Sequence, residues 1–229
     1  LHVFFYMYKF KDERKRAMKI GIIGATGNAG SAIYREASAR GHEVVAIVRN
    51  EEKAKEMFGN SVKTITKDAF ELKRGELEGF DAIIDAFATS PDQAYLHVDL
   101  AARLIHLFRG KKTRLFFILG AGSLLNDAGD LNVNDLKKAP DSESWIAIPE
   151  NQLDEYNFLL TVKNVDWVGI SPGNLFQAGE AKPAILGKDH LLQNDAGQSV
   201  TSSGTLAKAI LDELEVPQYQ QTRFTVIDA

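Results

Sequence analysis

The sequence predicts a three-layer α/β fold in which a doubly wound, mostly parallel sheet carries helices on both faces. Short apolar runs alternate with helical patterns along the chain, which is the sequence form of repeated βαβ units. The run 115–119, Leu-Phe-Phe-Ile-Leu, is apolar at every position, as expected of a strand covered on both faces. Because parallel strands are joined by right-handed crossovers, these units are expected to build a doubly wound sheet.

The individual elements follow from apolar periodicity and from stop signals. Strands are expected, in chain order, at 19–23, 43–48, 62–66, 82–85, 114–119 and 166–170. Helices are expected at 28–40, 92–109 and 203–215; the first two are followed by glycine and the third is followed closely by Pro217. The last apolar run, 223–227, is expected to be a closing edge strand.

Length and composition narrow the class of protein. The 229 residues fit one α/β domain or at most two small ones, and 45% apolar residues can build a sizeable core. A net charge of −4 gives no general attraction to nucleic acid or to an anionic membrane, and no apolar run is long enough to span a bilayer. The absence of cysteine excludes disulfides, thiolate nucleophiles and cysteine-based zinc sites, and it fits a cytoplasmic location. The five histidines lack metal-ligand spacing, so no metal site is expected.

The first 17 residues differ from the rest of the chain. They are apolar and aromatic at first and then strongly charged, with five basic and two acidic residues in all, whereas a secretory signal has its charge first. We expect an N-terminal extension over 1–17, followed by a single domain over 18–229. The extension is either a dispensable tail or expression remnant, or an amphipathic segment that docks on a second subunit.

The richest signal is a glycine-rich turn. Residues 20–30 read Ile-Gly-Ile-Ile-Gly-Ala-Thr-Gly-Asn-Ala-Gly and lie between the first strand and the first helix. Gly24 allows a sharp turn, Gly27 lets the backbone approach a pyrophosphate, and Gly30 lets the helix pack closely on the sheet. The amides of the helix N-terminus then offer hydrogen bonds to the phosphates. A glycine-rich turn without a ligand is the alternative, but the flanking strand and helix favour dinucleotide binding.

The end of the second strand indicates which dinucleotide binds. Enzymes that use NAD usually have an acidic residue there, about 20 residues beyond the glycines, to bind the ribose 2′-hydroxyl. Here the position is Arg49, whose guanidinium can pair with a 2′-phosphate and stack on the adenine. The sequence therefore favours NADP(H) over NAD(H), with a solvated strand-end arginine as the alternative.

The ends of the later strands should face the same crevice. Asp68 either contacts the adenine amino group or caps a helix before Phe70. The predicted cofactor-binding residues, taken together, are Gly24, Thr26, Gly27, Asn28, Ala29, Gly30, Arg49, Asp68, Ala86, Phe87, Ala88, Gly120, Ala121, Gly122 and Pro172.

Together these motifs resemble the atypical short-chain dehydrogenase/reductase superfamily. Within it, they resemble a group of NmrA-like bacterial NAD(P)H-binding proteins that are described as NADH-flavin reductases. That group is similar to biliverdin-IXβ/flavin reductase. The resemblance covers 18–229 and is carried by segments 22–27 (Ile-Ile-Gly-Ala-Thr-Gly), 41–49 (Gly-His-Glu-Val-Val-Ala-Ile-Val-Arg), 120–123 (Gly-Ala-Gly-Ser), 166–172 (Asp-Trp-Val-Gly-Ile-Ser-Pro) and 223–226 (Arg-Phe-Thr-Val). It implies a three-layer Rossmann fold with seven parallel strands, and reduction of planar, flavin-like acceptors by NAD(P)H.

The resemblance also assigns candidate catalytic residues. Ser123 matches a serine near the nicotinamide, and Asn174 stands where a relative carries histidine. The Tyr-x-x-x-Lys pair of the short-chain dehydrogenases is missing, because Leu160 stands four residues after Tyr156, where the lysine would be. Lys163 follows Tyr156 by seven residues. On a continuous helix it would lie on the same face as Tyr156, two turns away. Tyr156 is accordingly either a structural or pocket residue or, as the less favoured alternative, a proton donor.

Two interpretations of function remain open on the sequence. The first is an enzyme, an NADPH-dependent reductase of free flavin or a similar planar small molecule, with flavin as substrate and not as a prosthetic group. The second is a non-catalytic NADP(H) sensor of the NmrA type, which the missing tyrosine–lysine pair favours. A sugar-nucleotide epimerase would need a longer chain and that catalytic pair. The expected protein is a monomer or homodimer that acts on a small molecule.

Overall fold

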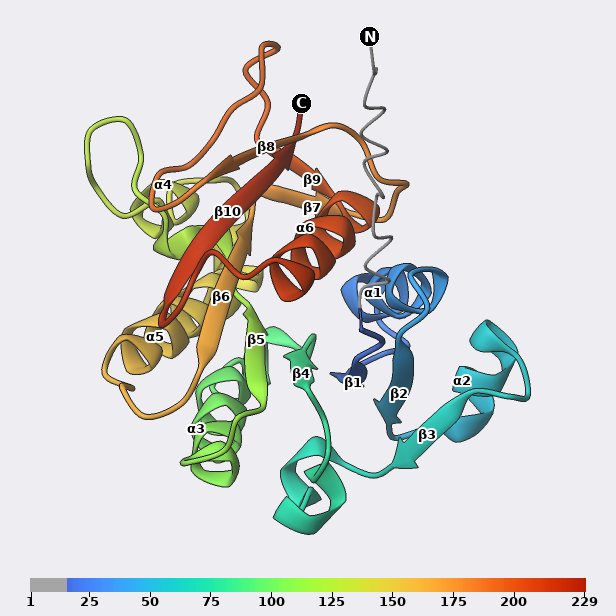
Figure 1. Cartoon of the computed structure of the whole chain (residues 1–229). Helices are drawn as coiled ribbons and strands as arrows, with labels where there is room; N and C mark the ends of the chain where they lie inside the picture. Colours follow the sequence, from blue (N-terminus) through green and yellow to red (C-terminus); the bar gives the residue numbers. More distant parts are fainter. Residues whose placement is uncertain (1–15) are drawn as a thin grey trace, which may run out of the picture.

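The computed structural model describes residues 16–229 and has a mostly parallel eight-stranded sheet at its centre (Figure 1). The strand order is β3-β2-β1-β4-β5-β6-β10-β8, and every neighbouring pair is parallel except β10 with β8. The strands are β1 (Lys19–Ile23), β2 (Glu43–Val48), β3 (Lys63–Thr66), β4 (Ala82–Asp85), β5 (Arg114–Ile118), β6 (Trp167–Pro172), β8 (Ala184–Gly187) and β10 (Thr222–Asp228). A separate parallel pair is formed by β7 (Leu175–Gln177) and β9 (Val200–Ser202). The three-layer α/β fold is thus confirmed.

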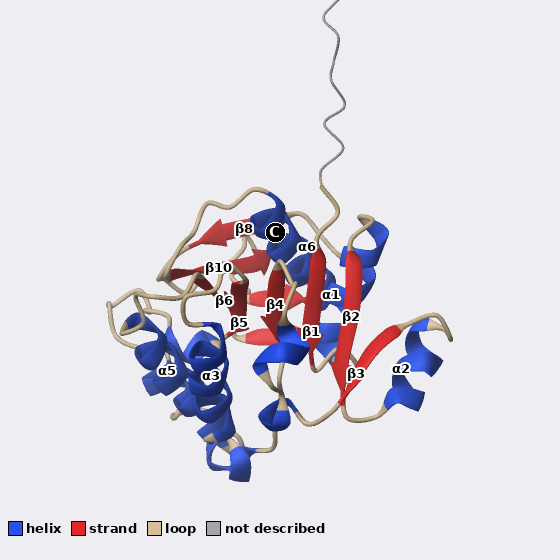
Figure 2. Cartoon of the chain, turned by 60° about the horizontal axis from the view of Figure 1, so that its bottom comes forward, coloured by secondary structure: helices blue, strands red, loops and turns tan. Residues whose placement is uncertain are grey.

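Helices cover both faces of the sheet, as the continuous apolar strand predicted (Figure 2). On one face α1 (Asn28–Ala39) packs beside α6 (Ser203–Glu215), and on the other α3 (Leu96–Phe108) packs beside α5 (Ala147–Leu160). In β5, Phe116 belongs to the first core, whereas Leu115 and Phe117 belong to the second. Alternate side chains of one strand therefore build two cores.

The remaining helices are short or lie at the sheet's edge. They are α2 (Glu51–Phe58), α4 (Val133–Leu136) and the 3₁₀ turns Ala69–Glu71, Arg74–Leu77, Pro91–Gln93, Ala121–Ser123 and Ser142–Ser144. The helix expected over 92–109 begins four residues later, at Leu96, because the chain first makes the 3₁₀ turn after Ser90.

One expectation about the sheet is wrong. The last strand, β10, is not an edge strand, because β8 pairs with its outer side in antiparallel register. The seven parallel strands that the resemblance implied are present, and β8 adds an eighth. β8 is short: it follows Pro183 and ends at Gly187. Its residues are exposed or half-buried, so the strand carries little apolar signal. The division into an extension and one domain stays a prediction, because residues 1–15 lie outside the described part of the chain.

Candidate functional site

The predicted site residues gather at the carboxyl ends of the strands, where β1 and β4 lie side by side. One hollow, of about 290 Å³, lies over the ends of β1 and β2, and a second, of about 430 Å³, lies over β4, β5 and β6. Both are lined by Gly27, Ala86, Phe87 and Ala88, so they form one continuous crevice. This edge, where the strand order reverses, is where open α/β sheets bind dinucleotides.

The glycine turn has the geometry that its spacing predicted. Gly24 has φ +71°, and a Cβ there would lie 2.5 Å from the carbonyl oxygen of Ala86. A Cβ on Gly30 would overlap the Gly24 carbonyl group, so glycine is required for α1 to begin this close to the turn. Gly27 is the N-cap of α1, and no side chain caps the helix. The first amides of α1 are therefore open to a phosphate group, and Asn28 and Ala29 line the crevice.

Basic side chains surround the hollow over β1 and β2. Arg49, Lys53 and Lys67 all line it. Lys67 pairs with Glu76 at 2.5 Å, whereas the described residues supply no ion-pair partner for Arg49. Asp68 lines the same hollow and its Oδ1 accepts a hydrogen bond from the Phe70 amide at 2.9 Å, so the capping alternative is confirmed, and its contact with adenine stays a prediction. The cations, together with the uncapped helix, fit the phosphate groups of a dinucleotide.

The second hollow is mainly apolar. The turn after β5 is pressed against α5: a Cβ on Gly122 would lie 2.9 Å from Cβ of Pro149, and one on Gly120 would overlap the Gln152 side chain. Beyond the predicted residues, its walls are formed by Thr89, His97, Ile118, Leu119, Leu136, Trp145, Ile148, Pro149, Gln152, Gly173 and Phe176. The hollow therefore has the apolar lining that is typical of small-molecule sites.

The predicted cofactor residues lie together in this crevice. Fourteen of them line one or both hollows, and Gly30 is buried behind the turn. Their contacts with a nucleotide stay predictions.

The three predicted catalytic residues do not meet in the crevice: only Asn174 lines it, whereas Ser123 and Tyr156 both contact Arg223. Asn174 lines the second hollow, where its Oδ1 accepts a hydrogen bond from the Asn132 amide at 2.7 Å. Ser123 is buried behind the wall, and its hydroxyl accepts a hydrogen bond from Arg223 at 2.5 Å. Tyr156 is in the core on the α3–α5 side, with the Arg223 guanidinium 4.2 Å from its ring centroid. Burial raises the pKa of Tyr156.

The helical relation expected between Tyr156 and Lys163 is wrong. The helix α5 ends at Leu160, so Lys163 lies beyond it, in an exposed loop. No tyrosine among the described residues lines the second hollow.

Sequence analysis missed most of the wall of the second hollow. Trp145, Ile148 and Gln152 come from the turn before α5 and from its first turns, a helix that the apolar pattern did not reveal because only Glu155, Tyr156 and Leu159 are buried in it. His97, interpreted as an ordinary packing or surface residue, is 5% exposed and lines this hollow. Its position on the buried face of α3 was the available signal.

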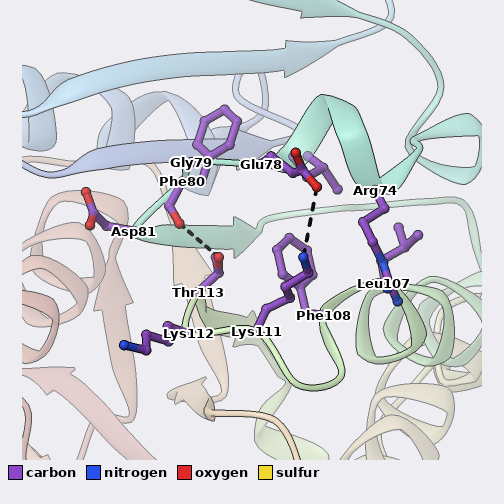
Figure 3. Close-up of a pocket in the computed structure, with 11 residues that line it drawn as sticks. Arg74, Glu78, Gly79, Phe80, Asp81, Leu107, Phe108, Lys111, Lys112 and Thr113 are labelled. Carbon is purple, nitrogen blue, oxygen red and sulfur yellow. Dashed lines mark hydrogen bonds and ion pairs between the residues drawn. The ribbon is translucent and has the colours of Figure 1, made fainter.

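A third hollow lies at the opposite edge of the sheet (Figure 3). It is formed by the amino ends of β4 and β5, with Thr113 donating a hydrogen bond to the Phe80 carbonyl group at 2.9 Å and Lys111 lying 3.9 Å from Glu78. Its volume of about 190 Å³ is smaller than that of either half of the crevice, and no helix of eight or more residues in the described chain begins there. Its lining therefore offers no helix N-terminus to the phosphates of a dinucleotide.

Two further properties bear on the class of protein. Among residues 16–229, no three His, Asp or Glu side chains are grouped so that they could hold a metal ion. No helix in this described part is both long and apolar enough to cross a bilayer.

Comparison with known proteins agrees with the geometry. A family described as NAD(P)H-binding matches this chain over residues 24–217. The protein YwnB of Bacillus subtilis, whose function is uncharacterised, is 39% identical over 214 residues, covering 92% of this chain and 98% of YwnB.

Solved structures extend the comparison. A Lactobacillus casei protein is 41% identical, with a TM-score of 0.86 over 93% of this chain and all of its own. A Streptococcus pneumoniae protein, named as a proposed NADH-flavin reductase, is 33% identical, with a TM-score of 0.83 over 93% of this chain and all of its own. A proposed epimerase from Bacteroides thetaiotaomicron is also 33% identical, with a TM-score of 0.82 over 93% and 98% of the two chains. The crevice and the family match agree: this chain belongs to the NAD(P)H-binding family, with the oxidoreductase-like Rossmann fold of its relatives.

Proposed function

We propose that the protein is an NADPH-dependent reductase of free flavin or a similar planar acceptor. The observation that carries the proposal is the difference in chemical character between the two ends of the crevice. One end has an uncapped helix N-terminus and a cationic rim, and the other end is an apolar hollow of about 430 Å³. A charged dinucleotide and a flat apolar acceptor could lie there end to end.

The choice of NADPH over NADH rests on the rim. Arg49 and Lys53 are exposed and line the hollow where the adenine ribose would lie. A guanidinium can form paired, charge-assisted hydrogen bonds with a 2′-phosphate, whereas a 2′-hydroxyl offers it little. The name of the Streptococcus relative mentions NADH, but the side chains at this rim favour the phosphorylated form.

The acceptor class rests on the walls of the second hollow. Phe87, Trp145 and Phe176 provide aromatic surface, and Pro149 and Ile148 complete the apolar lining. Such surfaces favour stacking with a planar ring system. Asn174 lines the same hollow and can donate a hydrogen bond from its amide nitrogen to a ring carbonyl, since its Oδ1 is already held by Asn132.

The division of labour follows from these contacts. The bound nucleotide would supply a hydride, and this is chemistry that belongs to the cofactor. The chain itself would bind the phosphates through the amides of α1, orient the two rings between Phe87 and the turn at Gly122, and keep water out with the start of α5.

A second candidate function is a redox sensor that binds NADP(H) without turnover. The absence of Tyr156 and Ser123 from the lining of the second hollow favours it, and the Ser123 hydroxyl is already held by the buried Arg223.

One assay separates the two candidates. Purified protein is mixed with NADPH and, in turn, FMN, FAD, riboflavin and small quinones, and NADPH consumption is followed by absorbance. Turnover that saturates with acceptor supports the reductase. Binding of NADPH, seen by calorimetry, with no turnover of any acceptor would overturn the reductase and leave the sensor.

A further inference from the structure

Three buried titratable groups lie beside the second hollow, where the acceptor is proposed to bind, and they have no part in holding the nucleotide. Glu155 on α5 is 2% exposed, His97 on α3 is 5% exposed, and Asp85 at the end of β4 is 6% exposed. Nδ1 of His97 is 3.9 Å from Oε2 of Glu155. Burying such groups without compensation is costly, so their presence beside a cavity points to function.

Neither carboxyl group has a lysine or arginine partner in the described part of the chain. There, Oε2 of Glu155 has no hydrogen-bond partner, and Asp85 has the amide of Phe87 as its donor, at 3.0 Å. Burial, together with the nearby charge of Asp85, raises the pKa of Glu155 well above its usual range. Burial raises the pKa of Asp85 to about 7. Burial therefore favours the protonated form of Glu155, and this acid faces the imidazole of His97.

His97 connects this acid to the cavity. Its ring forms part of the wall of the acceptor hollow and packs edge-on against Phe87, with ring centroids 5.4 Å apart. Burial lowers the pKa of His97 to about 4, so the ring is neutral at working pH, with one nitrogen free to accept a proton and the other able to donate one. The titratable group that faces it is Glu155 from α5, and Asp85 from β4 lies close enough to Glu155 to affect that residue's pKa. An approach of about 1 Å would turn the His97–Glu155 contact into a hydrogen bond.

We propose that Glu155 and His97 form a proton relay that delivers a proton to the reduced acceptor in the hollow. The relay rests on the proposed reductase function. Reduction of a planar acceptor by two electrons adds one hydride and one proton, and the hydride comes from the nicotinamide nucleotide, which is oxidised. The acid O–H bond of Glu155 breaks as its proton passes to Nδ1 of His97, while Nε2 releases its own proton to the acceptor. Glu155 is left as a carboxylate and regains a proton from solvent by the reverse path once product leaves.

The relay matters because the hollow is apolar. A reduced acceptor that has gained only a hydride carries a negative charge, which is costly among Trp145, Ile148 and Pro149. His97 is the proton donor at the cavity wall. Glu155 is a positioning residue that acts only through His97.

The first test compares Glu155→Gln with Glu150→Gln in the full chain. Glu150 is on the same helix but pairs with Lys137 at the surface, at 2.8 Å, and lines neither half of the crevice. We expect Glu155→Gln to lower kcat by about a hundredfold while the KM for the acceptor stays nearly unchanged. The variant should also lose the part of the pH profile of kcat that reports titration of Glu155. Glu150→Gln should behave as wild type. His97→Gln should show the same loss as Glu155→Gln, and the double variant should lose no more than either alone, because the two act in series.

Each outcome of this test is decisive. If wild type consumes NADPH with a saturable acceptor and Glu155→Gln keeps the wild-type kcat and pH profile, the relay is overturned while the reductase stands. If wild type shows no turnover with any acceptor, the proposed function has failed, and the relay fails with it.

The second test detects the acid directly, in protein without nucleotide. The infrared difference spectrum between wild type and Glu155→Gln at neutral pH should show the carbonyl stretch of a protonated, buried carboxylic acid. The corresponding spectrum for Glu150→Gln should lack this band. If Glu155 gives only carboxylate bands at neutral pH, the stored proton does not exist and the relay is overturned.

Discussion

In the glycine turn, a Cβ on Gly30 would overlap the carbonyl oxygen of Gly24, so the first turn of α1 is pressed against the end of β1. This contact brings the open amides of Asn28 and Ala29 to the crevice. Any side chain at position 30 would push the helix away and move those amides with it.

Gly30→Ala is therefore expected to weaken NADPH binding and to lower the free energy of unfolding by about 1–3 kcal/mol, the usual cost of overpacking. Urea denaturation and calorimetric titration with NADPH measure the two effects. Gly75→Ala is the matched control, because a Cβ at Gly75 meets nothing within 4 Å. Wild-type binding by Gly30→Ala would contradict the role of this close approach.

Arg49→Ala should weaken the binding of NADPH selectively. The loss of a paired, charge-assisted contact with the 2′-phosphate, worth roughly 1.5–3 kcal/mol, corresponds to a roughly ten- to hundredfold rise in Kd. NADH affinity should hardly change. Arg109→Ala, an exposed arginine outside both hollows, is the control. Equal losses for the two nucleotides would contradict the assignment of Arg49.

Trp145→Ala should raise the acceptor KM by about tenfold, because an aromatic face of the hollow is lost at a cost of about 1.4 kcal/mol. The Kd for NADPH should stay near its wild-type value. Steady-state kinetics with varied FMN measure the effect, and Tyr95→Ala, an aromatic residue that is 54% exposed and does not line the hollow, is the control. An unchanged KM would show that the acceptor binds elsewhere.

Ser123→Ala should affect stability more than catalysis. Its hydroxyl accepts a hydrogen bond from the buried Arg223 guanidinium, and losing it should cost about 1–3 kcal/mol. Thermal or urea unfolding, with the exposed Ser144→Ala as control, tests this. A large fall in kcat with unchanged stability would instead support the serine's direct role at the nicotinamide.

The pH dependence of stability should change in Glu155→Gln. An unfolded chain releases the Glu155 proton near the ordinary glutamate pKa of 4.5, whereas the folded state keeps that proton to higher pH. Wild-type stability therefore falls as pH rises from 4.5 to the raised pKa of the folded state. The slope from one such proton is about 1.4 kcal/mol per pH unit. The variant lacks this loss, so its unfolding free energy relative to wild type should increase with pH. Urea denaturation at several pH values measures the difference, and curves that stay parallel would show an ordinary acid at this position.

Much of the fold could be predicted from the sequence because its signals are local. The strands at β1, β2 and β4 and the helix α6 have the bounds that apolar periodicity predicted. Two of the helices that were not predicted have weaker patterns: α2 is mostly charged with only Ala54 buried, and α5 buries Glu155 beside two apolar residues. The antiparallel edge strand β8 is held by its pairing with β10 and has little apolar pattern of its own.

The sequence by itself determined the cofactor turn and the cation at the end of the second strand, because both depend on residues close together in the chain. Glycine spacing acts through backbone sterics within one turn, and Arg49 is placed by the strand it ends. Tertiary structure alone decided the acceptor half. It turned Ser123 and Tyr156 toward Arg223 and brought His97 from α3 beside Glu155 from α5. Such contacts join residues far apart in sequence, whose distances are set only when the helices pack on a common sheet.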